Sequence, residues 1–281
     1  MTSQIDTIHE FLAASDFDQT LSFDDSGSLL CEMLGVSNFE QKVAGLARIG
    51  LVQQGAELIY LLRHDPEFRR VRREHLIQVG KQVRLKKNVR LLVEILTGGL
   101  ESFRFSFYVI SAAPRDIVQS ALEGIVPADH IFGTELQFDA ASGEIASIIS
   151  VPAGYGKVSV LRSLETVLHA PPSRTIYMGD GSSDLAVMQH VNECEGYTIA
   201  VSEAKYLTRI AKRTVLSDNA LSVLVPILED LLHWNTDKIR ALFASHGLTL
   251  QEWDRVRTDW LSFHSSASTL PEAAAGAGAP Q

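Results

Sequence analysis

Acidic residues follow apolar runs in two short segments of this chain. DFDQT, residues 16–20, places Asp16 and Asp18 two residues apart, directly after an apolar run. GDGSSD, residues 179–184, places Asp180 in a glycine-rich loop after a second apolar run. Carboxylates this close repel each other, and carboxylate oxygens on tight loops suit a hard cation such as Mg²⁺. The spacing predicts a metal site formed by Asp16, Asp18 and Asp180, in which the cation offsets the repulsion.

Two further segments carry groups suited to binding an anion such as phosphate. SAAP, residues 111–114, offers the Ser111 hydroxyl and the backbone N–H groups beside it, including that of Ala112. The helix expected after this segment favours negative charge at its N-terminus. GYGK, residues 154–157, delivers Lys157 after two glycines, where its ammonium group would neutralise a phosphate or a carboxylate.

The segments that must position these groups alternate between strand and helix patterns. Because strands alternate with helices, we expect an α/β fold with a Rossmann-like, mostly parallel sheet. The polar groups would then converge at the carboxyl ends of the strands, where such sheets place their sites. The expected strands are 10–15, 103–111, 174–180 and 197–202, with a strand pair turning at 141–143 and helices at 112–125, 157–169 and 185–191.

Residues 26–100 interrupt this alternation, with apolar residues at the three- and four-residue spacing of helices. They are predicted to form a small helical cap domain inserted after the first strand. Near the C-terminus, Thr249 and Glu252 fit a capping box that would begin a helix. The predicted division is a core (1–25 and 101–232), a cap (26–100), a C-terminal helical extension (233–264) and a disordered tail (265–281).

The four segments DFDQT, VISAA, GYGK and GDGSSD, in this order and spacing, resemble the motifs of the haloacid dehalogenase-like superfamily of phosphotransferases. The resemblance covers roughly residues 10–230. The chain has room for a small helical cap between the first two motifs. In this respect it is similar to the phosphoserine phosphatase-like branch of the superfamily. The resemblance implies a core of this superfamily's fold, a Mg²⁺ cofactor and an aspartyl-phosphate intermediate.

The resemblance also implies a role for each matching residue. Asp16 would be the nucleophile. Asp18 would be the general acid and base, and would give its backbone carbonyl to Mg²⁺. Asp180 would be a metal ligand, and Asp184 would hold a metal-bound water. The groups that would bind the phosphate are those of Thr20, Ser111, Ala112 and Lys157.

Some positions depart from the pattern of true phosphoserine phosphatases. Ser183 stands where the family loop has Asn. Asp25, nine residues after Asp16, replaces a glutamate that holds the substrate amine, so we expect it either to contact substrate or to cap a helix. The cap arginine for the substrate carboxylate aligns with Leu46, with Arg48 nearby. These differences argue against phosphoserine itself as the substrate.

Residues 63–90 hold ten of the chain's 25 basic residues. One interpretation is a solvated helix face; the other is a positive cap surface that draws anionic substrates to an acidic site. Nucleic-acid binding is disfavoured because aromatic residues do not interleave in that stretch and the net charge is −9.

The remaining composition favours a cytoplasmic protein. Its two cysteines, Cys31 and Cys194, lie far apart and in no metal-binding spacing, as expected in a reducing compartment. The N-terminus lacks a signal-peptide pattern, and no apolar run is long enough to suggest a membrane span or membrane partner. A homodimer through the C-terminal helices is one possibility.

These observations favour a Mg²⁺-dependent phosphomonoester hydrolase, a phosphatase acting on a small phosphorylated metabolite. Dehalogenation is disfavoured because relatives with that activity lack the second acid, which is Asp18 here. Two alternatives stay open: phosphoryl transfer to an acceptor other than water, and a catalytically silent binding or regulatory protein of the same fold.

Overall fold

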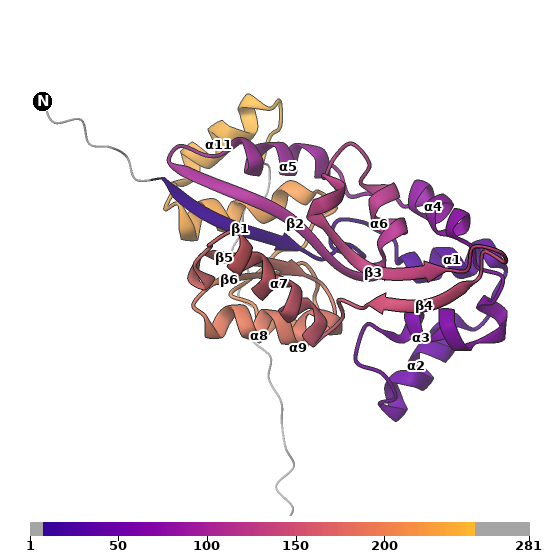
Figure 1. Ribbon diagram of the computed structural model, residues 1–281. Coiled ribbons are helices and arrows are strands. Elements are labelled where there is room, and N and C mark those ends of the chain that lie inside the picture. Colours follow the sequence, from indigo (N-terminus) through magenta and orange to yellow (C-terminus); the bar gives the residue numbers. More distant parts are fainter. Residues whose placement is uncertain (1–7, 251–281) are drawn as a thin grey trace, which may run out of the picture. The chain divides into compact units, whose positions relative to one another are not determined.

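The computed structural model describes residues 8–250, in which seven strands form one sheet of order β4-β3-β2-β1-β5-β6-β7 (Figure 1). Neighbouring strands are parallel except for the antiparallel pair β3–β4. This arrangement, with helices inserted between β1 and β2, confirms the predicted α/β fold class. The strands are β1 (His9–Ser15), β2 (Phe103–Pro114), β3 (Ile131–Phe138), β4 (Ile145–Ser150), β5 (Thr175–Gly179), β6 (Tyr197–Ala200) and β7 (Arg213–Thr214).

Helices cover both faces of the sheet. Leu12 and Ala14 of β1 join an apolar cluster with α7, α8 and α9, whereas α5 and α6 contact β2 on the opposite face (Figure 1). Central strands buried on both faces have continuous apolar runs, which explains the unbroken apolar pattern of residues 11–14. These helices are α5 (Val89–Gly98), α6 (Arg115–Ala121), α7 (Tyr155–Val167), α8 (Leu185–Glu193) and α9 (Lys205–Thr208).

The helical insertion has an apolar cluster of its own. The cluster extends into the core, because Ile117 of α6 and Leu136 of β3 belong to it. Gly80 permits a close approach: a Cβ there would lie 2.4 Å from the backbone oxygen of Ile117. The elements of the insertion that supply buried residues to the cluster are α1 (Ser26–Leu34), α3 (Glu57–His64), the 3₁₀ turn η1 (Pro66–Phe68) and α4 (Arg73–Gln82). Partly buried residues of α2 (Phe39–Ile49) pack against it.

The two chain segments that join the insertion to the sheet run side by side. The backbone N–H of Phe23 donates to the carbonyl of Arg84, and the N–H of Lys86 donates to the carbonyl of Leu21. The guanidinium of Arg84 also pairs with the Asp24 carboxylate, 2.5 Å away. Strand-like pairing between the two crossings fixes where the insertion leaves and re-enters the core.

The second strand differs from the sequence prediction. It was expected to end at Ser111, with Pro114 in the first turn of a helix, but β2 continues to Pro114 and α6 begins at Arg115. The register of β2 against β3 shifts here, so that three residues of β2 lie opposite Gly133 alone. Such a bulge bends a strand locally. Hydrophobic pattern alone does not reveal it.

Two compact units divide the chain between Trp234 and Asn235. The first ends with short helical segments: the 3₁₀ turn η5 (Ala220–Val223), α10 (Leu224–Pro226) and η6 (Ile227–Leu231). In the second, the Asn235 side chain caps α11 (Thr236–Ser245) by accepting a hydrogen bond from the N–H of Lys238. The predicted helix at Thr249 and the tail 265–281 extend outside the described residues. Within residues 8–250, no helix combines the length and apolar character needed to cross a membrane.

Candidate active site

Asp16 comes directly after the last residue of β1, at the carboxyl edge of the sheet. Its N–H donates to the carbonyl of Met178 in β5, which ties it to the neighbouring strand. The chain then turns sharply, because the N–H groups of Thr20, Leu21 and Ser22 all donate to the carbonyl of Phe17. Phe17 is fully buried and anchors this turn. The turn carries Asp18 away from Asp16.

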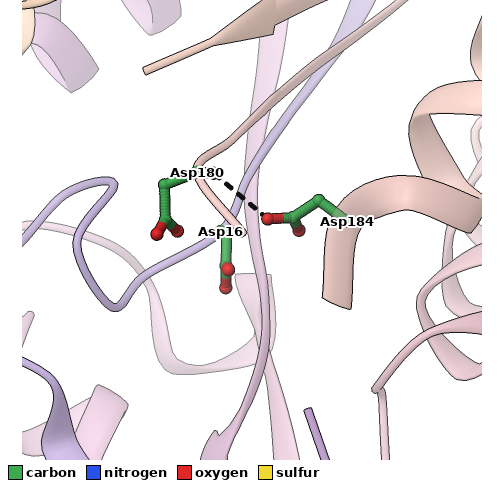
Figure 2. Close-up of side chains that lie close together, drawn as sticks. All are labelled: Asp16, Asp180 and Asp184. Carbon is green, nitrogen blue, oxygen red and sulfur yellow. Dashed lines mark hydrogen bonds between the residues drawn. The ribbon is translucent and has the colours of Figure 1, made fainter. Parts of the chain in front are cut away.

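Three carboxylates converge at this edge, those of Asp16, Asp180 and Asp184 (Figure 2). One oxygen from each lies within 4.8 Å of the others. The ammonium group of Lys157 is fully buried beside them, 2.9 Å from Asp16 and 2.6 Å from Asp184. With all three acids ionised, a single lysine leaves two negative charges unbalanced. These residues therefore fit a divalent cation, which would supply the missing charge.

The site's electrostatics follow from this crowding. Burial and the charge of Asp184 raise the pKa of Asp16 well above its usual value, although Lys157 opposes the shift. Burial and Asp184 also raise the pKa of Asp180, to about 6. Burial by itself would lower the pKa of Lys157, but Asp16 and Asp184 more than reverse the effect and raise it. Lys157 therefore stays charged.

The Asp184 carboxylate accepts four hydrogen bonds from groups around the site. One carboxylate oxygen accepts hydrogen bonds from Lys157 and from the Tyr177 hydroxyl, at 2.6 and 2.7 Å. The other accepts from the backbone N–H groups of Asp180 and Gly181, the first of which is drawn in Figure 2. Sequence reasoning missed Tyr177. A tyrosine two residues before GDGSSD in a buried strand was the available signal, because a buried hydroxyl needs a partner.

Asp18 lies in a different environment from Asp16. Its carboxylate accepts hydrogen bonds from the N–H and hydroxyl of Ser26, at the start of α1. Burial, followed by the charge of Asp25, raises the pKa of Asp18 to about 8, although the Ser26 bonds oppose the shift. A carboxyl group with this pKa holds its proton near neutral pH and can donate it.

The predicted phosphate-binding residues lie near this edge in different settings. The Thr20 hydroxyl donates to Asp180, 3.1 Å away. Ser111 is buried in the bulge of β2, where its Oγ accepts from the N–H of Ala113. Ala112 precedes that residue, and its carbonyl accepts from Thr134. Phosphate binding by Thr20, Ser111, Ala112 and Lys157 stays a prediction.

Asp25 takes the position of a helix cap. Its carboxylate accepts hydrogen bonds from the N–H and hydroxyl of Ser28, in the first turn of α1. This satisfies a free N–H at the helix start and engages one carboxylate oxygen. Of the two predicted roles the structure displays the cap, and substrate contact by Asp25 stays a prediction.

A family model for haloacid dehalogenase-like hydrolases matches residues 13–189, more than half of the chain. The chain belongs to the haloacid dehalogenase-like hydrolase family. The matched range includes every member of the acid cluster and Lys157. Among curated proteins, none matches this hydrolase in sequence.

Solved structures share the fold of this hydrolase at low sequence identity. A phosphoserine phosphatase as a phospho-aspartyl intermediate analogue is 17% identical, with a TM-score of 0.62 over 79% of this chain and 99% of that chain. A substrate-bound phosphoserine phosphatase is 16% identical, with a TM-score of 0.62 over 79% and 98%. A hydrolase of the haloacid dehalogenase family from Salmonella enterica subsp. enterica serovar Typhi is 15% identical, with a TM-score of 0.63 over 80% of this chain and 72% of that chain.

Proposed function

We propose that this hydrolase is a Mg²⁺-dependent phosphatase that cleaves phosphomonoesters of small metabolites through an aspartyl-phosphate. The observation that carries the proposal is the buried pairing of the Asp16 carboxylate with Lys157, beside Asp180 and Asp184. A carboxylate at the end of a strand, with a fixed cation beside it, suits nucleophilic attack on phosphorus.

In the first step, a carboxylate oxygen of Asp16 forms a bond to phosphorus as the bond to the leaving alcohol breaks. Asp18 donates its proton to the leaving oxygen. In the second step, Asp18 takes a proton from water, whose oxygen attacks phosphorus and releases Asp16 and inorganic phosphate. Lys157 neutralises negative charge on Asp16 and on the phosphoryl oxygens throughout.

Asp16 and Asp180 would hold the cation, together with the backbone carbonyl of Asp18. Asp184, whose two oxygens already accept four hydrogen bonds, would hold the loop and a metal-bound water. The cation would neutralise charge on the phosphate during transfer. The raised pKa values of Asp16 and Asp180 support this assignment, because they mark charge that the chain itself does not balance.

The first test is hydrolysis of p-nitrophenyl phosphate with Mg²⁺ by wild type and Asp16→Asn. We expect the substitution to lower kcat by at least about a thousandfold, because the amide is a poor nucleophile. Asp139→Asn, which changes an acid in the turn between β3 and β4, is the matched control and should keep full activity. Activity that survives Asp16→Asn, or a wild type inactive with Mg²⁺, Mn²⁺ and Co²⁺, would show the proposal to be wrong.

A further inference from the structure

One loop of the insertion lies against the segments that carry the site. It spans residues 51–56, between α2 and α3. Gly55 lies so close to the core that a Cβ there would be 2.6 Å from the Cβ of Ser183, in the GDGSSD loop. The same point lies 3.6 Å from the Cβ of Ala112 in β2 and 3.5 Å from that of Ala153 before α7. One glycine thus contacts all three segments.

The close approach of Gly55 to Ser183 depends on both residues being small. Gly55 has a φ of +90°, in the left-handed region where glycine is favoured. Ser183 offers only a short side chain, at the position where the family loop has asparagine. A longer side chain at either position would hold the loop away from the core.

Gln53, in the same loop, lies over the start of α7. Its Oε1 would be 3.1 Å from a Cβ placed on Gly154, and its Nε2 would be 4.0 Å from one placed on Gly156. Lys157, which contacts Asp16, follows directly. The Gln53 side chain is exposed, and its amide has no hydrogen-bond partner within residues 8–250. A donor and an acceptor are therefore available beside the catalytic edge.

We propose that Gln53 is a specificity-determining residue that hydrogen-bonds the alcohol portion of the substrate, and that the seating of Gly55 on Ser183 positions it. This inference rests on the proposed phosphatase function. The residues that line this rim are uncharged, and the carboxylate of Glu57 next to it is buried and accepts a hydrogen bond from the N–H of Gly55. The alcohol that the rim suits is therefore an uncharged one bearing hydroxyl groups. An amide can donate to one hydroxyl and accept from another. The rim residues are Gln53, Gly55, Ala112, Ala153, Gly154 and Ser183.

The substrate class is tested by comparing glucose 6-phosphate and glycerol 3-phosphate with phosphoserine. We expect kcat/KM to be higher for the better polyol phosphate than for phosphoserine, because the rim residues carry no charge for its ammonium and carboxylate groups and the nearby Glu57 carboxylate is engaged by the Gly55 N–H. A preference for phosphoserine would overturn this class. If p-nitrophenyl phosphate is not hydrolysed either, the proposed function itself fails, which separates the two failures.

The role of Gln53 is tested with Gln53→Ala, and the adjacent exposed Gln54→Ala is the matched control. We expect Gln53→Ala to lower kcat/KM about tenfold for the better polyol phosphate, the value of one lost hydrogen bond, and far less for p-nitrophenyl phosphate. Gln54→Ala should change neither value. Equal effects of Gln53→Ala on both substrates, or none on either, would refute the role.

The seating contact is tested by hydrogen exchange of residues 51–56, which needs no activity. Gly55→Ala should speed exchange, and the double variant Gly55→Ala/Ser183→Gly should restore part of the protection, because it removes the atom that the new methyl group meets while the backbone strain at φ +90° remains. Gly50→Ala is the control, since Gly50 also has a positive φ but no atom within 4 Å of an added Cβ. Failure of Ser183→Gly to restore protection, or equal exchange in Gly55→Ala and Gly50→Ala, would overturn the contact.

Discussion

Asp16 and Asp18 are two residues apart in sequence, yet their carboxylates have different partners. Asp16 pairs with Lys157, whereas Asp18 accepts hydrogen bonds from Ser26. The turn anchored by buried Phe17 produces this separation. Two carboxylates that would repel each other in a continuous strand thus have different surroundings, which suits the separate roles of nucleophile and acid proposed for them.

The proposed proton donation by Asp18 can be tested by measuring how kcat/KM depends on the leaving group. Asp18→Asn should slow an alkyl phosphate by about 10²–10⁴-fold, because a poor leaving group needs the proton. It should slow p-nitrophenyl phosphate much less, because p-nitrophenolate leaves without one. The measurement is kcat/KM for both substrates in both proteins, and equal slowing would contradict the acid role.

The raised pKa of Asp18 also predicts how stability depends on pH without divalent cations. A carboxyl group with a pKa of about 8 in the folded state binds its proton more tightly than in the unfolded chain, where the value is 3.8. Its contribution to stability is fully present below pH 3.8 and is lost as pH rises through about 8. The Tm of wild type should therefore fall relative to that of Asp18→Asn between pH 5 and 9, in EDTA.

Asp24→Asn is the control for this pH dependence. Hydrogen bonding to Arg84 lowers the pKa of Asp24, so this group stays ionised in both states above pH 5. The Tm difference between wild type and Asp24→Asn should stay constant from pH 5 to 9. A wild-type Tm that runs parallel to that of Asp18→Asn would mean that Asp18 is ionised in the folded protein at neutral pH.

At the scale of elements, the basic stretch 63–90 supplies ties between the insertion and the rest of the chain. Arg73 pairs with Asp116 of α6 at 2.8 Å. Arg69 pairs at 3.2 Å with Glu144, which directly precedes β4. Lys87 pairs with Asp218 at 2.6 Å. These cations point to carboxylates of the protein itself. The structure thus adds a role that neither sequence interpretation of this stretch included.

The substitution Arg73→Gln tests whether Arg73 stabilises the contact between the insertion and α6 or attracts an anionic substrate. The Arg73 side chain is 61% exposed, so a double-mutant cycle with Asp116→Asn should give a coupling of about 0–1 kcal/mol in the free energy of unfolding. KM for an anionic substrate at low salt should not change. Arg63→Gln is the control, because Arg63 has no ion pair among the described residues. A rise in KM that disappears at high salt would favour steering instead.

At the scale of the first compact unit, insertion and sheet share apolar packing. Ile117 of α6 and Leu136 of β3 are buried together with residues of α1, α3 and α4. The acid cluster and the loop 51–56 therefore belong to elements that support each other. We expect this unit to unfold cooperatively.

Ile117→Ala tests that cooperativity. Truncating this fully buried side chain should lower the free energy of unfolding by about 2–5 kcal/mol and reduce hydrogen-exchange protection in both α4 and β2. Val167→Ala, at an exposed position at the end of α7, should leave both unchanged. Protection lost in only one of the two elements would mean that insertion and sheet unfold separately.

The sequence by itself determined the fold class and the four segments that carry chemistry. Apolar runs that end in acids, and the alternation of strand and helix patterns, are local features written in residue type and spacing. The family match is consistent with this, since it covers residues 13–189 and so all four segments.

Only the tertiary structure decided which partners those residues have. The bulge in β2 depends on strand register, and the contact of Gly55 with Ser183 joins segments far apart in sequence. The hydrogen bonds of Tyr177 to Asp184 and of Ser26 to Asp18 span seven and eight residues, and each depends on how the chain between the two residues turns. Residue spacing carries no information about such contacts, because packing between distant elements sets both the distances and the local dielectric that shifts each pKa.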